Sequence, residues 1–207
     1  MPNKIAQGTI DWAVASRVMP GETVCGDLHM VKPIADGVLV SVVDGLGHGD
    51  EALAAAQAAV VILEQHADQP LDALIRRCHE ALGQTRGAVI TLVRLSGSDS
   101  GLTWLGIGNV EAVLLRAGSE AKAKSERLLL RGGLVGYQLP KLQFSRLPIA
   151  PGDLLVIATD GIAPAFPYDV VRSASPRQIA DGILRRHFKG SDDALVLVAR
   201  YVGHGHK

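Results

Sequence analysis

Aspartates stand beside strongly apolar runs at four places in this 207-residue chain. Asp44 ends VLVSVVD and Asp160 ends DLLVIATD, and a glycine follows each of them. Asp192 and Asp193 come directly before ALVLVAR, and Asp27 follows a glycine in VCGDLH. Apolar runs of this kind predict buried strands, so the carboxylates would lie at strand ends and would converge if the strands share a core.

A convergence of carboxylates predicts a site for hard divalent cations. Anions gathered in one place repel each other and lose hydration, and a bound cation removes both penalties. Oxygen ligands favour Mg²⁺ or Mn²⁺ in roughly octahedral geometry. Two such ions, about 4 Å apart, can activate a shared water for in-line attack on a phosphoryl group. The chemistry predicted here is the hydrolysis of a phosphate ester.

Each aspartate also has a plainer interpretation. Asp-Gly is a common turn dipeptide, so Asp44 or Asp160 by itself is more often a turn residue. The pair Asp192–Asp193 also fits a helix-to-strand connection, and Asp27 alone carries little information. It is the combination of acidic strand ends that favours a metal site.

Composition narrows the class of protein. The chain has 21 basic and 21 acidic residues, so its net charge gives no support for nonspecific binding to nucleic acid or acidic membranes. The N-terminus lacks the layout of a signal peptide and no apolar stretch is long enough to span a membrane, which favours a cytoplasmic protein. Two distant cysteines, Cys25 and Cys78, predict neither a disulfide framework nor a zinc site.

The hydrophobic patterns predict an α+β domain with three helices. These helices are expected at about 50–65, between Pro70 and Gly83, and at about 176–187, where Ser175 and Gln178 form a capping-box pattern. Strands are expected at 10–19, 38–43, 88–95, 102–107, 111–116, 127–130, 141–147, 153–158 and 194–201. Because helices and strands do not alternate strictly, the pattern differs from a doubly wound parallel sheet.

The acidic motifs, in this order, resemble those of the PPM family of metal-dependent serine/threonine phosphatases, above all its small SpoIIE-type bacterial branch. CGDLH resembles the first acidic motif, VVDGLGHG the Asp-Gly metal motif, ATDGI the Thr-Asp-Gly motif and GSDDALVLV the closing motif. GIGNVEAVLLR and GGLVGY resemble the segments between them. The likeness covers about residues 5–201 and implies a single PPM-type domain over 1–207, with a flexible tail at 202–207.

The resemblance implies two packed antiparallel sheets flanked by helices, an αββα sandwich, with two divalent metal ions at one end. These ions would be Mn²⁺ or Mg²⁺. By this resemblance, Asp44 bridges both metals and the Gly45 carbonyl binds one of them. Asp160 and Asp192 would bind the first metal.

Two further aspartates and one histidine follow the family pattern less closely. Asp27 would act near the second metal, directly or through water, and Asp193 stands where relatives often have Asn, so it is expected to be a supporting residue. Better-known eukaryotic relatives have a candidate general acid, a histidine, where this chain has Leu46. His48 is the substitute candidate, with a loop or helix-start role as the alternative. Arg17 is no clear match for the phosphate-binding arginine of those relatives, so no substrate-binding residue is assigned.

The size of the chain leaves little room for a regulatory domain beside the phosphatase, as in a stand-alone stressosome phosphatase. The resemblance then implies removal of phosphate from phosphoserine or phosphothreonine on STAS-domain stressosome proteins in bacterial stress signalling. The alternatives are a phosphatase of a single-domain anti-sigma-factor antagonist and a catalytically weak binding module with the same fold. The sequence contains no G-x-x-x-x-G-K-[ST], H-E-x-x-H or G-x-S-x-G motif for other enzyme classes.

Overall fold

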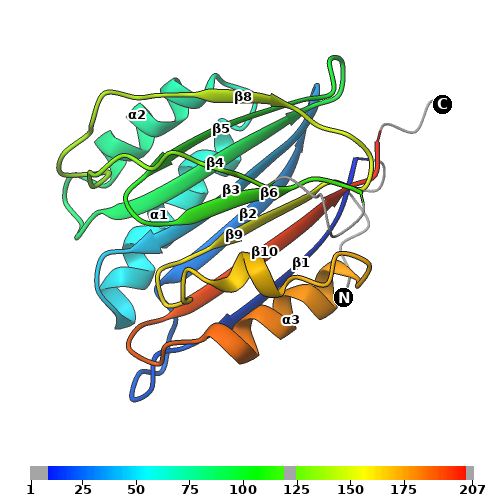
Figure 1. Cartoon of the computed structure of the whole chain (residues 1–207). Coiled ribbons are helices and arrows are strands. Elements are labelled where there is room, and N and C mark those ends of the chain that lie inside the picture. Colours follow the sequence, from blue (N-terminus) through cyan, green and yellow to red (C-terminus); the bar gives the residue numbers. More distant parts are fainter. Residues whose placement is uncertain (1–8, 119–124, 204–207) are drawn as a thin grey trace.

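The computed structural model describes residues 9–118 and 125–203 of the chain. Within these residues, two five-stranded antiparallel sheets pack face to face, and helices cover both outer faces (Figure 1). The αββα sandwich predicted from the sequence is therefore confirmed. The predicted domain limits near residue 5 and most of the predicted tail, with its two histidines, lie outside the described residues.

Each sheet combines segments from distant parts of the chain. The first sheet contains, in spatial order, β1 (Ile10–Arg17), β10 (Ala194–Tyr201), β9 (Leu154–Ala158), β6 (Glu111–Leu115) and β7 (Ser125–Arg127). The second sheet contains β2 (Asp27–Ile34), β3 (Gly37–Gly45), β4 (Ala88–Ser96), β5 (Gly101–Ile107) and β8 (Ser145–Pro148).

Three apolar layers hold the sandwich together. The inner faces of the two sheets meet in a core that includes Trp104 and Leu197. Helices α1 (Gly49–Gln65) and α2 (Leu71–Ala81) cover the outer face of the second sheet, and α3 (Pro176–His187) with η3 (Phe166–Asp169) covers that of the first. The central strands β3, β4, β9 and β10 are thus buried on both faces, which explains why their sequences are nearly continuous apolar runs.

The predicted strands differ from the observed ones in three places. Strand β2 was not predicted, because Lys32 and Pro33 interrupt its pattern; β2 is an edge strand, where a proline is tolerated. Strands β7 and β8 are shorter than predicted and shifted in position. Between them, Leu128 N donates to Ala112 O in β6 and Arg131 N donates to Gly106 O in β5, so the chain crosses here from one sheet to the other.

Helix α3 begins with the predicted capping box. The Ser175 hydroxyl accepts a hydrogen bond from Gln178 N at 3.3 Å, and the Gln178 side chain accepts one from Ser175 N at 3.0 Å. The other end of α3 leads into the loop that carries Asp192, and Lys189 N in this loop donates to Gly161 O at 2.9 Å. The helix therefore helps to position the acidic strand ends.

Within the described residues, no helix combines the length and the apolar character needed to cross a membrane.

We expect Ser175→Ala to lower the free energy of unfolding by about 1 kcal/mol, because the first turn of α3 loses its side-chain acceptor. Urea unfolding followed by circular dichroism measures the change. Ser173→Ala is the matched control, since Ser173 is exposed and its side chain makes no hydrogen bond within the described residues. An equal loss in both variants would contradict the role of the cap.

Candidate metal centre

Strands β2 and β3 bring two aspartates face to face. Asp27 is the first residue of β2, and Asp44 is the penultimate residue of β3. The two residues are direct partners in the antiparallel register. Directly opposite side chains project from the same face of a sheet with Cβ atoms about 5 Å apart. The second sheet therefore contributes one pair of neighbouring carboxylates.

The first sheet contributes the other aspartates at the same end of the sandwich. Asp160 follows the end of β9 by two residues, and Asp192 and Asp193 directly precede β10. Thr159 connects the two sheets: its hydroxyl donates to Asp27 Oδ2 at 2.7 Å and accepts from Leu195 N at 2.9 Å. The four acidic stretches predicted to converge thus lie at one end of the fold.

Asp193 is engaged by the backbone of the β1–β2 connection. Its Oδ1 accepts from Met19 N at 2.8 Å and its Oδ2 accepts from Gly26 N at 2.7 Å. Gly26 O in turn accepts from Gly45 N at 3.2 Å. Asp193 is 2% exposed, so this carboxylate fixes the loop that leads to Asp27. The supporting role of Asp193 at a metal site stays a prediction.

The acidic end is electrostatically unfavourable without a counter-charge. Burial, the largest cause, and the charges of the other four aspartates together raise the pKa of Asp44 to about 9. Burial also raises the pKa of Asp27 to about 7, although the hydrogen bond from Thr159 opposes the change. Burial and the charge of Asp160 raise the pKa of Asp192, and the charge of His48 opposes them. Positive charge would let this cluster ionise fully at neutral pH.

The donor set fits hard cations. Within the described residues, no hydrogen-bond donor reaches the carboxylate of Asp44, and the aspartate side chains offer oxygen ligands. Among the described residues, however, no three His, Cys, Asp or Glu side chains form a cluster close enough to hold an ion by themselves. Mg²⁺ usually keeps several waters and needs few direct carboxylates, so hydrated ions suit this arrangement. The individual ligand roles of Asp44, Gly45, Asp160, Asp192 and Asp27 stay predictions.

The glycine-rich loop after Asp44 allows the chain to turn sharply from β3 into α1. A Cβ atom on Gly45 would lie 2.0 Å from the carbonyl oxygen of Ala52, so only glycine fits against the helix. Gly47 and Gly49 have φ values of +92° and +76°, in the left-handed region that favours glycine. The loop therefore presents Asp44 and Gly45 at the acidic end while α1 packs directly behind them.

His48 lies at the N-cap of α1 and is held by a partner that sequence reasoning missed. Its Nδ1 lies 2.6 Å from Glu22 Oε1, and its side chain makes no capping hydrogen bond. The charge of His48 lowers the pKa of Asp192, so the two side chains lie within electrostatic reach of each other. A carboxylate bonded to Nδ1 orients the imidazole and leaves Nε2 for proton transfer.

Sequence reasoning also missed two polar residues that hold the aspartates. Asn109 Nδ2 donates to Asp160 Oδ2 at 2.7 Å, and Thr159 connects Asp27 to β10 as described above. Asn109 lies in the motif GIGN and Thr159 in the motif ATDGI, so their place in these motifs could have indicated a role at the site. Arg17 ends β1 opposite Ala194, but its guanidinium stacks over Phe188 at 5.1 Å, so it is not assigned to substrate.

Comparisons with known proteins agree with this architecture. Residues 35–202 match the family model of Stage II sporulation protein E (SpoIIE). Phosphoserine phosphatase RsbX of Bacillus subtilis (strain 168) is 24% identical over 181 residues, which cover 87% of this chain and 89% of that protein.

Two solved structures show the same fold. A chain from the bacterial stressosome, a modular system that has been adapted to control secondary messenger signaling, has a TM-score of 0.82 and 28% identity, covering 92% of this chain and 99% of its own. RsbX in complex with magnesium has a TM-score of 0.81 and 22% identity, covering 93% of this chain and 96% of its own. Because the family model spans most of the chain and includes Asp44, Asp160 and Asp192, this chain belongs to the SpoIIE family, as its acidic motifs predicted.

Proposed function

We propose that this chain is a metal-dependent protein serine/threonine phosphatase that uses two divalent ions, Mn²⁺ or Mg²⁺. The observation that carries the proposal is the gathering of buried and half-buried aspartates at one end of the sandwich, where burial and mutual repulsion raise the pKa of Asp44 to about 9. Cations at this end would relieve that repulsion. Membership of the SpoIIE family and the likeness to a phosphoserine phosphatase support the proposal.

In this proposal, Asp44, the Gly45 carbonyl, Asp160 and Asp192 hold the ions, and Asp27 acts beside them or through water. When bound, such ions supply an activated water and neutralise charge on the phosphoryl oxygens. His48, oriented by Glu22, gives a proton to the leaving oxygen of serine or threonine.

Three residues outside the ion-binding set position it. Thr159 fixes Asp27, Asn109 fixes Asp160, and Asp193 anchors the β1–β2 connection. Each of them acts through a hydrogen bond to a carboxylate or to the backbone, so none needs to touch the substrate.

The proposed substrates are phosphorylated STAS-domain proteins of a stressosome, with the whole chain forming one cytoplasmic phosphatase domain. The likeness to RsbX and to a chain of the bacterial stressosome supports this choice. A single-domain anti-sigma-factor antagonist is the alternative substrate, and a catalytically weak binding module is the alternative function.

We expect hydrolysis of a phosphothreonine peptide to require Mn²⁺ or Mg²⁺ and to stop with EDTA. Asp44→Asn should lower turnover at least roughly a hundredfold, because charge stabilisation of the transition state is lost. Asp72→Asn, which changes an exposed aspartate in the first turn of α2, is the control and should keep full activity. Full turnover in a folded Asp44→Asn variant would refute the metal centre.

The same assay separates the alternatives for the partner. Phosphorylated STAS scaffold protein and phosphorylated single-domain antagonist are compared by kcat/KM in parallel with the peptide. A folded protein that hydrolyses none of the three with any divalent ion would favour the binding module. A preference for the antagonist would overturn the stressosome assignment and leave the phosphatase in place.

The metal-free protein should lose stability as pH rises. Burial gives Asp44 and Asp27 folded-state pKa values of about 9 and about 7, above the ordinary 3.8, so between these values the folded state binds more protons than the unfolded state. The free energy of unfolding then decreases with pH, by at most about 1.4 kcal/mol per pH unit for each carboxyl. Urea unfolding in EDTA at pH 5 and pH 8.5 measures this decrease.

Two comparisons check the cause of that pH dependence. Asp44→Asn should flatten the profile, and saturating Mg²⁺ should restore stability at pH 8.5 by replacing the protons. If the free energy of unfolding of the wild type decreased with pH no more steeply than that of Asp44→Asn, burial would not raise the pKa of Asp44.

His48→Gln should slow the phosphoserine peptide roughly a hundredfold, the lower range for general acid catalysis. It should change turnover of an aryl phosphate little, because an aryl oxide leaves without a proton. His66→Gln, at the other end of α1, is the matched control. Equal losses on the two substrates would assign His48 to the loop structure instead.

A further inference from the structure

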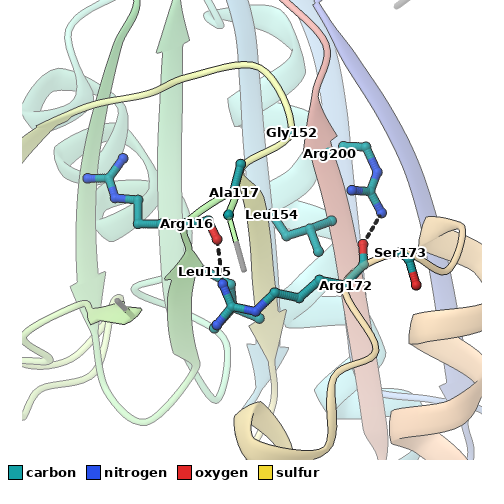
Figure 2. A pocket seen from close by; sticks show the side chains of 9 residues that line it. Leu115, Arg116, Ala117, Gly152, Leu154, Arg172, Ser173 and Arg200 are labelled. Carbon is teal, nitrogen blue, oxygen red and sulfur yellow. Dashed lines mark hydrogen bonds between the residues drawn. The ribbon is translucent and has the colours of Figure 1, made fainter. Parts of the chain in front are cut away.

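A hollow of about 360 Å³ lies beside the first sheet, away from the aspartates. The chain after β6, residues Gly152 and Leu154, and the segment that leads into α3 surround it (Figure 2). Arg200, which lines it, is eight residues beyond Asp192, and β10 is extended over nearly this whole length. At 3.3 Å per residue, the hollow is about 26 Å from the acidic end. It is therefore a separate place on the molecule.

Two guanidinium groups line this hollow, and neither has a carboxylate partner within the part of the chain that the structure describes. Arg200 Nη2 donates to the carbonyl oxygens of Arg172 at 2.9 Å and Ala174 at 2.7 Å, and Arg172 Nη1 donates to the carbonyl oxygen of Arg116. Figure 2 shows the hydrogen bond from Arg200 to the Arg172 carbonyl and the one from Arg172 to the Arg116 carbonyl. Within the described residues neither arginine forms an ion pair, although Asp11 is the register partner of Arg200. Carbonyl dipoles satisfy some N–H groups but leave both positive charges uncompensated.

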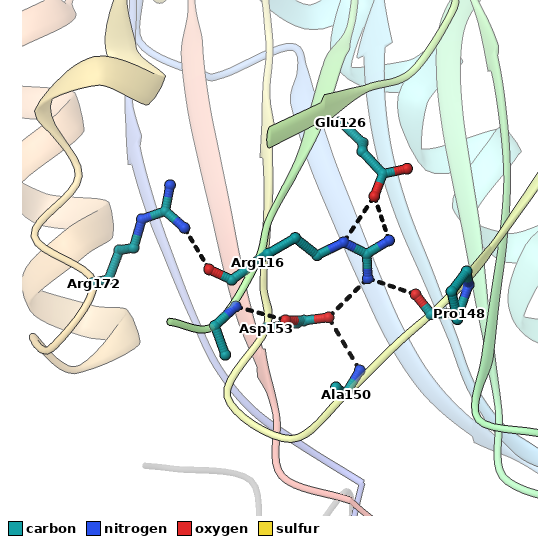
Figure 3. Close-up of polar contacts among 7 residues, drawn as sticks. Arg116, Glu126, Pro148, Ala150, Asp153 and Arg172 are labelled. Carbon is teal, nitrogen blue, oxygen red and sulfur yellow. Dashed lines mark hydrogen bonds and ion pairs between the residues drawn. The ribbon is translucent and has the colours of Figure 1, made fainter. Parts of the chain in front are cut away.

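The neighbouring Arg116 provides a contrast, because its charge is fully compensated. Its guanidinium pairs with Glu126 and with Asp153, which is 2.9 Å from Nη1, and also donates to the Pro148 carbonyl (Figure 3). Burial disfavours the charge, but the bonds to both carboxylates outweigh it and raise the pKa of Arg116. Figure 2 shows this guanidinium directed away from those of Arg172 and Arg200.

One acidic residue beside the hollow, Asp153, is already engaged by Arg116. Asp153 is 2% exposed and accepts from Ala117 N at 2.7 Å and from Ala150 N at 3.0 Å, in addition to Arg116. These bonds fix one wall of the hollow and leave no free oxygen of Asp153 for Arg172 or Arg200. Asp153 therefore does not compete with an external anion for the two guanidinium groups.

We propose that this hollow binds a small molecule that carries a phosphate or carboxylate group, held by Arg172 and Arg200. The planar fork of a guanidinium matches the paired oxygens of such groups. The volume lies in the range of small-molecule sites, and Leu115 and Leu154 provide an apolar surface beside the arginines. Among the described residues no aromatic side chain lines the hollow, so these residues give a nucleobase no stacking surface. The site needs neither the metal ions nor the phosphatase activity.

The test is residue-resolved NMR of the arginine Nε–Hε groups in the full chain with saturating Mg²⁺. Inorganic phosphate and acetate are titrated separately at constant ionic strength, with chloride as the reference. We expect saturable shifts of the Arg172 and Arg200 signals with at least one of the two anions, and the stronger one identifies the group that the site prefers. Shifts that grow linearly and equal those in chloride would overturn the proposal.

Three variants make the result specific. Arg200→Gln should weaken binding at Arg172 by roughly tenfold or more, since a charge-assisted hydrogen bond is lost. Ser173→Glu leaves both arginines and their carbonyl contacts in place but adds a competing carboxylate at the rim of the hollow. It should weaken anion binding by a similar factor. This variant tests the site even if Arg200→Gln disturbs the fold. Arg185→Gln removes an exposed charge from α3 outside the hollow and should have no effect. Unchanged affinity in Ser173→Glu, or equal loss in Arg185→Gln, would refute the site.

Discussion

The structure depends on keeping five carboxylates together at one end of the sandwich, two of them buried and three half-buried. Burial and repulsion oppose this arrangement, as the pKa of Asp44, raised to about 9, indicates. Neutral groups stabilise it in part: the Thr159 hydroxyl binds Asp27, and two backbone N–H groups bind Asp193. None of these groups supplies a positive charge to Asp44. The fold therefore provides rigidity and geometry, and leaves charge compensation to whatever binds there.

Rigidity at this end comes from very close backbone approaches. A Cβ atom on Gly45 would lie 2.0 Å from Ala52 O, and one on Gly161 would lie 2.0 Å from Asp193 O. Each glycine follows an aspartate of the acidic end, so the backbone packs tightly where each carboxylate must be fixed. Helices α1 and α3 stand behind the two sheets and restrict movement of these strand ends. Conformational freedom is thereby lost during folding, before any ligand arrives.

The central strands could be predicted from the sequence because they depend on local pattern, whereas the ligand roles of the aspartates stay predictions. Strands buried on two faces appear as apolar runs, and the Ser175 capping box specifies the start of α3 locally. Strand β2 was missed because Pro33 interrupts its pattern. The pairing of Asp27 with Asp44 was missed as well, because it depends on the register of β2 and β3 across the Ile34–Gly37 turn. The contact between Glu22 and His48 joins two loops through tertiary packing, so no local pattern could predict it.

The equal numbers of acidic and basic residues conceal an uneven distribution of charge. Asp44, Asp160 and Asp192 lie at one end of the sandwich, whereas Arg200 lies about 26 Å away along β10. Within the described residues, neither Arg200 nor its neighbour Arg172 forms an ion pair. Helix α3 connects the two regions, since the segment containing Arg172 leads into its start and the loop with Asp192 follows its end. A net charge of zero excludes a strong overall field, but it does not exclude strong local fields of opposite sign. Local charge imbalance, rather than the total, decides which ligands each end of this molecule can bind.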